Sequence, residues 1–289
     1  MRSCGFAEKG RVMSALQKAV TSSDGTTIAY EQTGHGPAVV LVASSLADRS
    51  DMKRLAALVA SRFTVINYDR RGRGLSSDTP PYHVQREVED MGALVDEAGG
   101  SAFVFGSSSG AVLALEAAAS GVNIGKLALY EPPFRVDHNG PLPPHDLGKD
   151  IARLIAENRR GRAVRLFMTQ AIGVPSSMVV GMRLMPGVWS KLKGMAHTIT
   201  YDIAVMGDTQ SGNPLPADHW AGVKVPTLVI DGGKSSTAQR NAVQALINAL
   251  PNAQRRTLPG QGHAAPVMAP KKLSPMLIEF FAVESVDDE

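Results

Sequence analysis

Five consecutive residues follow the pattern Gly-x-Ser-x-Gly: Gly106-Ser107-Ser108-Ser109-Gly110. The apolar run 102–105 precedes them and an alanine- and leucine-rich run follows, so the pattern lies between a predicted strand and a predicted helix. A turn this tight requires small residues at 106 and 110, and it pushes the Ser108 hydroxyl out at the edge of a sheet. The sequence therefore predicts that Ser108 is a nucleophile. The alternative is that the serine triplet is an ordinary turn.

A serine hydroxyl becomes a good nucleophile only when a base takes its proton, so a histidine must lie within reach. The chain has seven histidines. His263 follows the last predicted strand after the loop Pro259-Gly260-Gln261-Gly262 and precedes the last predicted helix. Such a loop lies over the same sheet edge as the serine turn. We therefore predict that His263 is the general base, the alternative being an ordinary surface-loop histidine.

Strands and helices must alternate to bring these two residues together. Predicted strands cover 15–21, 27–31, 38–43, 63–68, 102–105, 126–130, 227–231 and 254–258, and predicted helices cover 52–60, 84–98, 109–120, 237–250 and 272–281. This order is typical of an α/β fold with a mostly parallel, doubly wound sheet. We predict an N-terminal extension (1–14), a core (15–135 and 222–289) and a helical cap inserted between the two core segments (136–221).

Three motifs together resemble the α/β-hydrolase superfamily: the serine turn, the loop 68–76 and Gly260-Gln261-Gly262-His263. The resemblance extends from about residue 15 to residue 281. It implies an α/β-hydrolase fold, acyl-transfer chemistry and the chain order nucleophile, acid, histidine. It also implies that Asp69 and the arginines of the loop 68–76 form structural ion pairs.

The acid of the triad departs from the commonest family pattern. Many members carry an aspartate a few residues after the strand at 227–231, where this chain has Ser235, and Asp231 lies about four residues early. Zearalenone-type lactonases are similar in pairing a strand-end Glu-x-Pro with a serine turn and a late histidine. This resemblance implies Glu131, in Glu131-Pro132-Pro133, as the acid that orients the imidazole. Asp231 remains the alternative acid, and Glu131 could instead only cap the segment that follows it.

The oxyanion hole also departs from the common pattern, because Ala43-Ser44-Ser45-Leu46 replaces the usual His-Gly after the third predicted strand. Backbone N–H groups supply the donors in such holes, and the residue after the nucleophile gives one of them. We therefore predict the N–H groups of Ser45 and Ser109 as the donors, with the Ser45 hydroxyl as an additional candidate. The alternative is that the missing glycine distorts the hole.

The predicted cap is rich in methionine and aromatic residues, which predicts an apolar substrate pocket. The candidate pocket residues are Leu46, Met168, Met185, Trp189, His197 and Met206. Any one of them could instead belong to a plain apolar core. The resulting prediction is a serine esterase or lactonase, without metal or cofactor, that acts on a hydrophobic small molecule. The alternatives are a non-hydrolytic enzyme of the same fold (a lyase or a cofactor-free perhydrolase) and a slow-turnover ligand-binding protein.

Composition narrows the partners. The net charge is only +3 and the arginines are scattered without aromatic residues between them, so we expect no nucleic-acid partner. The lone Cys4 excludes an internal disulfide and a cysteine-based metal site. No run of 18 apolar residues and no apolar leader in the first 20 residues is present, so we expect a cytoplasmic protein without a membrane partner. The sequence is also compatible with a homodimer.

Overall fold

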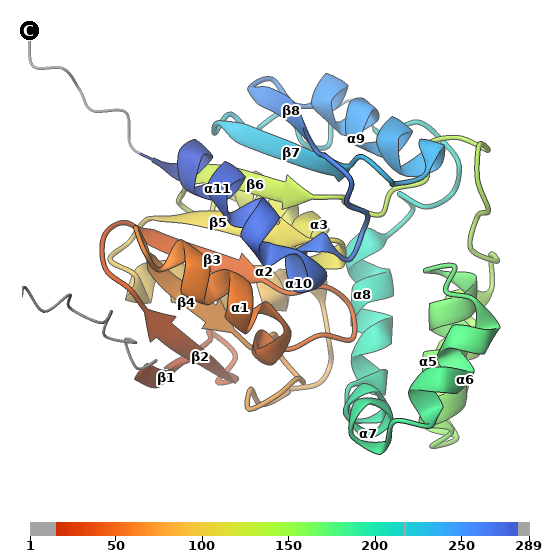
Figure 1. Cartoon of the computed structure of the whole chain (residues 1–289). Helices are drawn as coiled ribbons and strands as arrows, with labels where there is room; N and C mark the ends of the chain where they lie inside the picture. Colours follow the sequence, from red (N-terminus) through yellow and green to blue (C-terminus); the bar gives the residue numbers. More distant parts are fainter. Residues whose placement is uncertain (1–15, 217, 283–289) are drawn as a thin grey trace, which may run out of the picture.

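The computed structural model describes residues 16–216 and 218–282 of the chain (Figure 1). The predicted N-terminal extension, 1–14, and Cys4 lie outside the described residues. Among the residues that are described, no helix is long and apolar enough to cross a membrane.

One eight-stranded sheet forms the centre of the molecule, with the strand order β1-β2-β4-β3-β5-β6-β7-β8 (Figure 1). The strands are Leu16–Thr21 (β1), Thr27–Thr33 (β2), Ala38–Val42 (β3), Thr64–Tyr68 (β4), Ala102–Ser107 (β5), Ile124–Tyr130 (β6), Thr227–Gly232 (β7) and Ala253–Leu258 (β8). β1 and β2 form an antiparallel hairpin and β2 runs antiparallel to β4, whereas all other pairings are parallel. The predicted α/β fold with a mostly parallel sheet is confirmed.

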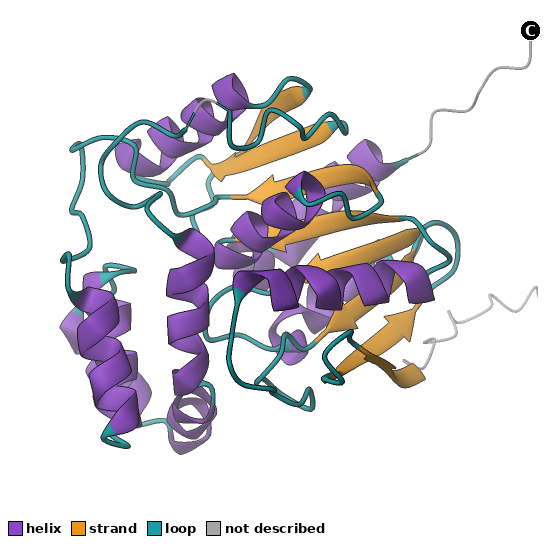
Figure 2. Cartoon of the chain, turned by 180° about the vertical axis from the view of Figure 1, so that it is seen from behind, coloured by secondary structure: helices purple, strands orange, loops and turns teal. Residues whose placement is uncertain are grey.

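Helices cover both faces of this sheet (Figure 2). Helices α1 and α11 pack on one face, and α2, α3 and α9 pack on the other. Their bounds are Arg49–Val59 (α1), Val84–Glu97 (α2), Ser109–Ala119 (α3), Thr237–Ala249 (α9) and Pro270–Phe281 (α11); the short α10 spans Ala265–Met268. Because both faces are covered, central strands such as β3 are buried and read as continuous apolar runs in the sequence.

The sheet brings the ends of β5 and β6 together at its carboxyl edge. Ser107, the last residue of β5, pairs in register with Tyr130, the last residue of β6. One residue later, the N–H of Ser108 donates to the carbonyl of Tyr130 at 2.9 Å, and the N–H of Glu131 donates to that of Ile230 at 3.0 Å. Ser108 and Glu131 therefore leave the sheet from neighbouring strands at the edge where ligands bind in such folds.

Between β6 and β7, the described residues form five α-helices and one short 3-10 helix, which we call the cap. Their bounds are Leu147–Ala156 (α4), Arg160–Gln170 (α5), Ser176–Arg183 (α6), Pro186–Gly194 (α7), Ala196–Thr198 (η1) and Ile199–Met206 (α8). Both views show α8 between the sheet and the helices α5 and α6 (Figures 1 and 2). It contacts α2 and α3 of the core as well as α4 of the cap. α8 is therefore the element that joins the cap to the serine turn.

Candidate active site

The serine turn has the strained geometry that the sequence predicts. Ser108 has φ 55° and ψ −123°, a conformation that non-glycine residues rarely adopt. A Cβ on Gly106 would lie 2.4 Å from the carbonyl oxygen of Gly110, and one on Gly110 would lie 2.5 Å from those of Val42 and Ala43. Only glycine fits at both positions, so β3, β5 and α3 approach closely enough to hold Ser108 at the sheet edge.

His263 lies beside Ser108, in the loop between β8 and α10. Its Nε2 is 3.0 Å from the Ser108 Oγ, and its Nδ1 is 2.8 Å from Oε2 of Glu131. The Glu131 side chain is completely buried, whereas that of His263 is 42% exposed. With Nδ1–H donating to the carboxylate, Nε2 is the acceptor that faces the serine hydroxyl. This is the arrangement that a serine nucleophile, its base and the base's orienting acid require.

Neutral donors hold the other oxygen of the Glu131 carboxylate. The N–H of Gly232 donates to Oε1 at 2.6 Å, and the Ser235 hydroxyl donates to the same atom. Ser235 is the position at which the family resemblance expects an aspartate, so here that position supports the glutamate from the adjacent loop. The sequence did not indicate this role for Ser235.

Asp231, the alternative acid, contacts residues of β8. Its carboxylate accepts from the Arg255 guanidinium at 2.6 Å and from the Thr257 hydroxyl at 2.8 Å, both on β8. Asp231 is therefore a buried structural residue between β7 and β8. Glu131, and not Asp231, is the carboxylate that contacts His263.

The two predicted oxyanion-hole residues are joined to each other. The Ser45 hydroxyl donates to the Ser109 hydroxyl at 2.9 Å, and that hydroxyl donates to Oδ1 of Asp202 at 2.9 Å. Because its proton is directed to Ser109, the Ser45 hydroxyl is not the extra donor that the sequence suggested. Ser109 begins α3, and the first N–H groups of a helix have no partner within the helix. Its backbone N–H therefore has no partner within the helix.

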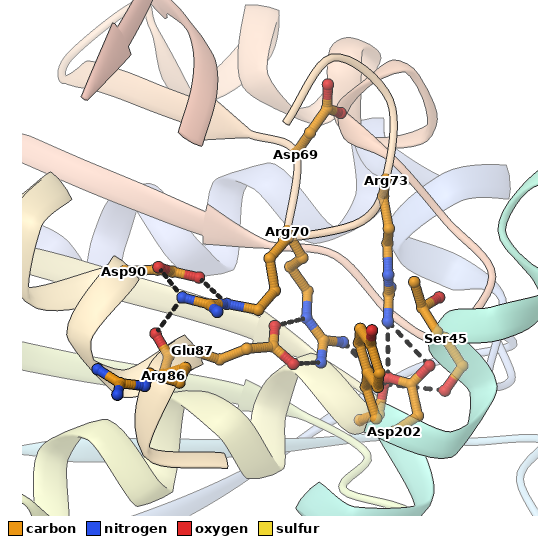
Figure 3. A network of polar contacts seen from close by, with 12 residues as sticks. Ser45, Asp69, Arg70, Arg73, Arg86, Glu87, Asp90 and Asp202 are labelled. Atoms are coloured by element: carbon orange, nitrogen blue, oxygen red, sulfur yellow. Dashed lines mark hydrogen bonds and ion pairs between the residues drawn. The ribbon is translucent and has the colours of Figure 1, made fainter. Parts of the chain in front are cut away.

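A buried ionic network fixes the backbone behind these serines (Figure 3). Asp202, on α8, accepts a hydrogen bond from Arg70 at 2.8 Å. Its two carboxylate oxygens also accept from Nη2 of Arg73, at 2.9 and 2.8 Å. Arg70 also pairs with Glu87 through two bonds of 2.7 Å, and Arg73 donates to the carbonyl of Ser44 at 2.8 Å. The network therefore links the cap to the loop that carries Ser45.

Asp202 is completely buried. Burial alone would raise the pKa of its carboxyl, but the guanidinium groups of Arg73 and Arg70 outweigh burial and hold this pKa below its ordinary value. Asp202 is missing from the sequence-based prediction. A signal was present, because it is the lone carboxylate in an otherwise uncharged helix, Ile199–Met206.

The remaining charges of the loop 68–76 are also paired, which confirms the expectation of structural ion pairs. Arg71 contacts Asp90 at 2.7 Å and Asp24 at 2.9 Å, and Asp69 pairs with Arg49. The arginines after β4 therefore contribute to the site by forming ion pairs that hold its backbone.

A cavity of about 400 Å³ opens at Ser108 and His263. Its apolar lining comes mainly from the cap: Phe167, Ala171, Ile172 and Met206. Its polar lining includes Arg135, Gln210, Lys234, Ser236 and Gln239. In the described part of the chain, no three His, Cys, Asp or Glu side chains gather as a metal site would require. The cavity is thus apolar on one side and polar, with two cations, on the other.

The predicted pocket residues require correction, because only Met206 of the six lines this cavity. Leu46 and Met168 are buried in the cap's own apolar core. Met185 is 56% exposed, and Trp189 lies beside Arg183. His197 lies 3.7 Å from Asp78. The helical pattern indicated apolar faces correctly, but it could not indicate whether each face meets the cavity or another cap helix.

Comparisons with known proteins agree with this fold. A model of the Alpha/beta hydrolase family matches residues 34–275. An alpha/beta hydrolase from Sphaerobacter thermophilus DSM 20745 is 49% identical, with a TM-score of 0.85 over 92% of this chain and 100% of that one. An esterase from Rhodococcus sp. ECU1013 shares the fold, with a TM-score of 0.65 and 18% identity over 91% of this chain and 98% of its own.

Curated relatives match shorter segments. A zearalenone hydrolase from Cladophialophora bantiana is 35% identical over 109 residues, which are 35% of this chain and 41% of that protein. An uncharacterized hydrolase from Bacillus subtilis (strain 168) is 35% identical over 96 residues, 32% of this chain and 35% of its own. The matched segments thus cover less than half of either relative. The family model, in contrast, spans most of the sheet, the serine turn and His263, and the chain belongs to the alpha/beta hydrolase family.

Proposed function

We propose that this protein is a serine hydrolase that cleaves a carboxylic ester or lactone through an acyl-enzyme. One observation carries the proposal: the continuous contact from Glu131 to His263 to Ser108, at 2.8 and 3.0 Å, ends at a cavity. A serine that serves only as a turn residue has no need of an oriented imidazole. This geometry also argues against a binding protein, because binding alone does not require a base beside a hydroxyl.

In the first half of the reaction, the Ser108 Oγ attacks the carbonyl carbon while Nε2 of His263 takes the hydroxyl proton. The buried carboxylate of Glu131 stabilises the imidazolium that forms. The N–H groups of Ser45 and Ser109 donate to the oxyanion. When the intermediate collapses, the carbon–oxygen bond of the leaving group breaks, and His263 gives its proton to the leaving alcohol.

In the second half, His263 removes a proton from water, and the resulting hydroxide attacks the acyl carbon. Collapse of this second intermediate breaks the bond to Ser108, and His263 returns the proton to the serine. With a lactone the alcohol and the acid remain in one molecule. The step needs no cofactor, because every proton is moved by His263.

The lining of the cavity supports a small substrate with an apolar part. Phe167, Ile172 and Met206 give the cap side of the cavity an apolar surface. A cavity of about 400 Å³ suits a small molecule and is too small for a folded protein chain.

Hydrolysis of para-nitrophenyl hexanoate, followed by release of para-nitrophenol, tests the proposal. Ser108→Ala is expected to lower kcat by on the order of 10⁴-fold or more. Ser107→Ala is the matched control, because it makes the same change one residue earlier, and it should keep most of the activity. Turnover that survives in Ser108→Ala, or that is lost equally in Ser107→Ala, would contradict the role of Ser108.

A further inference from the structure

Arg135 occupies a fixed position in the wall of the cavity. It follows Glu131 by four residues, where the chain leaves β6 for the cap. Its backbone N–H donates to the carbonyl of Thr209 at 2.8 Å, and its own carbonyl accepts from the N–H of Gly212 at 2.8 Å. The segment that carries Arg135 is therefore tied to the segment that follows α8, and its side chain starts from an anchored backbone.

The guanidinium of Arg135 has little to bind within the protein. A guanidinium offers five N–H donors. Within residues 16–216 and 218–282, its side chain makes one hydrogen bond, from Nη1 to the carbonyl of Phe134 at 3.0 Å, and no carboxylate pairs with it. Partial burial lowers the pKa of Arg135, and no charge in the described part of the chain counters this effect. A cation that is drawn out of water without a partner is costly unless a ligand supplies one.

The fully buried arginines of the loop 68–76 show how this chain accommodates a guanidinium away from water. Arg70, Arg71 and Arg73 are each paired with at least one buried carboxylate. Arg135 departs from this pattern and lies in the cavity of the reactive serine. This difference indicates that Arg135 serves to bind a ligand and not to stabilise the fold.

The remaining charges of the cavity leave room for an anion. Among the described residues that line the cavity, the one carboxylate is that of Glu131, and it is already bound to His263, Gly232 and Ser235. A second cation, Lys234, also lines the cavity and is exposed at the start of the β7–α9 loop. The unpaired charge that faces the cavity is therefore positive, although the sequence suggested an apolar pocket.

We infer that the substrate is an ester or lactone that also carries a free carboxylate, and that Arg135 binds this carboxylate. The planar guanidinium can donate two parallel hydrogen bonds to it, which fixes the orientation of the substrate. The ester carbonyl at the other end then lies at Ser108. This inference rests on the proposed function and names its substrate class.

Two matched esters test the inference: para-nitrophenyl hydrogen adipate, which ends in a carboxylate, and para-nitrophenyl hexanoate, which ends in a methyl group. The wild type should prefer the adipate ester in kcat/KM. Arg135→Gln should lower kcat/KM for the adipate ester by roughly 10- to 100-fold, mainly through KM, as expected for loss of a charged hydrogen-bonding partner. For the hexanoate ester the change should stay within about threefold, because its chain offers no anion. Arg135→Lys should restore part of the preference.

Lys234→Gln is the control, since it removes one positive charge from the same cavity at an exposed position, and it should change the preference by less than about threefold. An unchanged preference in Arg135→Gln, an equal loss for both esters, or an equal effect of Lys234→Gln would overturn the assignment to Arg135. In each of these cases the wild type still hydrolyses the hexanoate ester, so the proposed function stands. No turnover of either ester by the wild type would contradict the proposed function, and this inference with it.

Discussion

Ser108 and Ser109 are neighbours in the chain, yet they lie in opposite surroundings. The Ser108 hydroxyl faces the cavity and lies 3.0 Å from His263, whose side chain is partly exposed. The Ser109 hydroxyl is fully buried and lies 2.9 Å from Asp202. A step of one residue at the start of α3 thus separates the Ser108 hydroxyl, which a ligand can reach, from the Ser109 hydroxyl, which is held in a buried hydrogen-bond network.

The charged groups around Ser108, which we call the side of Ser108, differ from those around Ser109, which we call the side of Ser109. On the side of Ser108, a single carboxylate is held by neutral donors and by one imidazole, which can gain and lose a proton. On the side of Ser109, the Asp202 carboxylate meets two guanidinium groups that stay charged at any ordinary pH. We therefore expect substitutions on the side of Ser108 to lower the rate of the reaction. Substitutions on the side of Ser109 should lower the stability of the fold.

After Ser108→Ala, the largest effect is expected from Glu131→Gln, which should lower kcat for para-nitrophenyl hexanoate by on the order of 10³- to 10⁴-fold while the protein stays folded. The carboxamide presents N–H to Nδ1 of His263, so the ring holds its proton on Nε2 and cannot take one from Ser108. Steady-state kinetics measure the loss of kcat, and a urea unfolding curve shows whether the variant is still folded.

Asp231→Asn is the matched control for this change, since it alters a buried carboxylate at the end of the next strand. Its partners are Arg255 and Thr257, which touch neither His263 nor Ser108. The loss of kcat should be much smaller than for Glu131→Gln. The reverse ranking would show that the acid has been assigned to the wrong strand.

The next effect concerns stability. Asp202→Asn leaves two buried guanidinium groups without their shared carboxylate, so the free energy of unfolding should fall by about 3–5 kcal/mol. Asp150→Asn is the control, because the Asp150–Arg153 pair of the cap is about half-exposed and should contribute less than about 1 kcal/mol. Urea unfolding measures both. Equal losses would show that the buried network is no more important than a surface pair.

The smallest effect is the pH dependence of the difference in unfolding free energy between the wild type and Asp202→Asn. The pKa of Asp202 is held below its ordinary value of 3.8 in the folded protein, so near that pH the unfolded state binds more protons at this group. The stability from Asp202 is therefore present at neutral pH and is lost as the pH falls below that value. The gap in unfolding free energy between wild type and Asp202→Asn should shrink from pH 7 toward pH 3. A gap that widens on acidification would contradict the charged state of Asp202.

The sequence is sufficient to predict the side of Ser108 because the relevant signals are local. Glycines that exclude any Cβ mark the turn at Ser108, and the loop after the last strand marks His263. Glu131 required the family resemblance as well, because a strand-end glutamate by itself carries no such meaning. Strand and helix bounds agree with the prediction to within three residues in the core, where continuous apolar runs mark buried strands.

The side of Ser109 could not be predicted, because its partners are remote in the chain. Asp202 lies 93 residues from Ser109 and 132 from Arg70, so only the tertiary fold reveals the contact. The same reason explains the errors in the pocket. Apolar spacing shows that Met168 has a buried face, but only the packing of the cap shows that this face meets other cap helices.

Covalent trapping identifies the nucleophile directly. The protein is treated with an alkyl fluorophosphonate, digested and mapped by mass spectrometry. We expect one phosphonyl group on Ser108, no label in Ser108→Ala, and slow labelling in Glu131→Gln. Labelling of Ser107 or Ser109 in place of Ser108, or undiminished labelling of Ser108→Ala, would contradict this expectation.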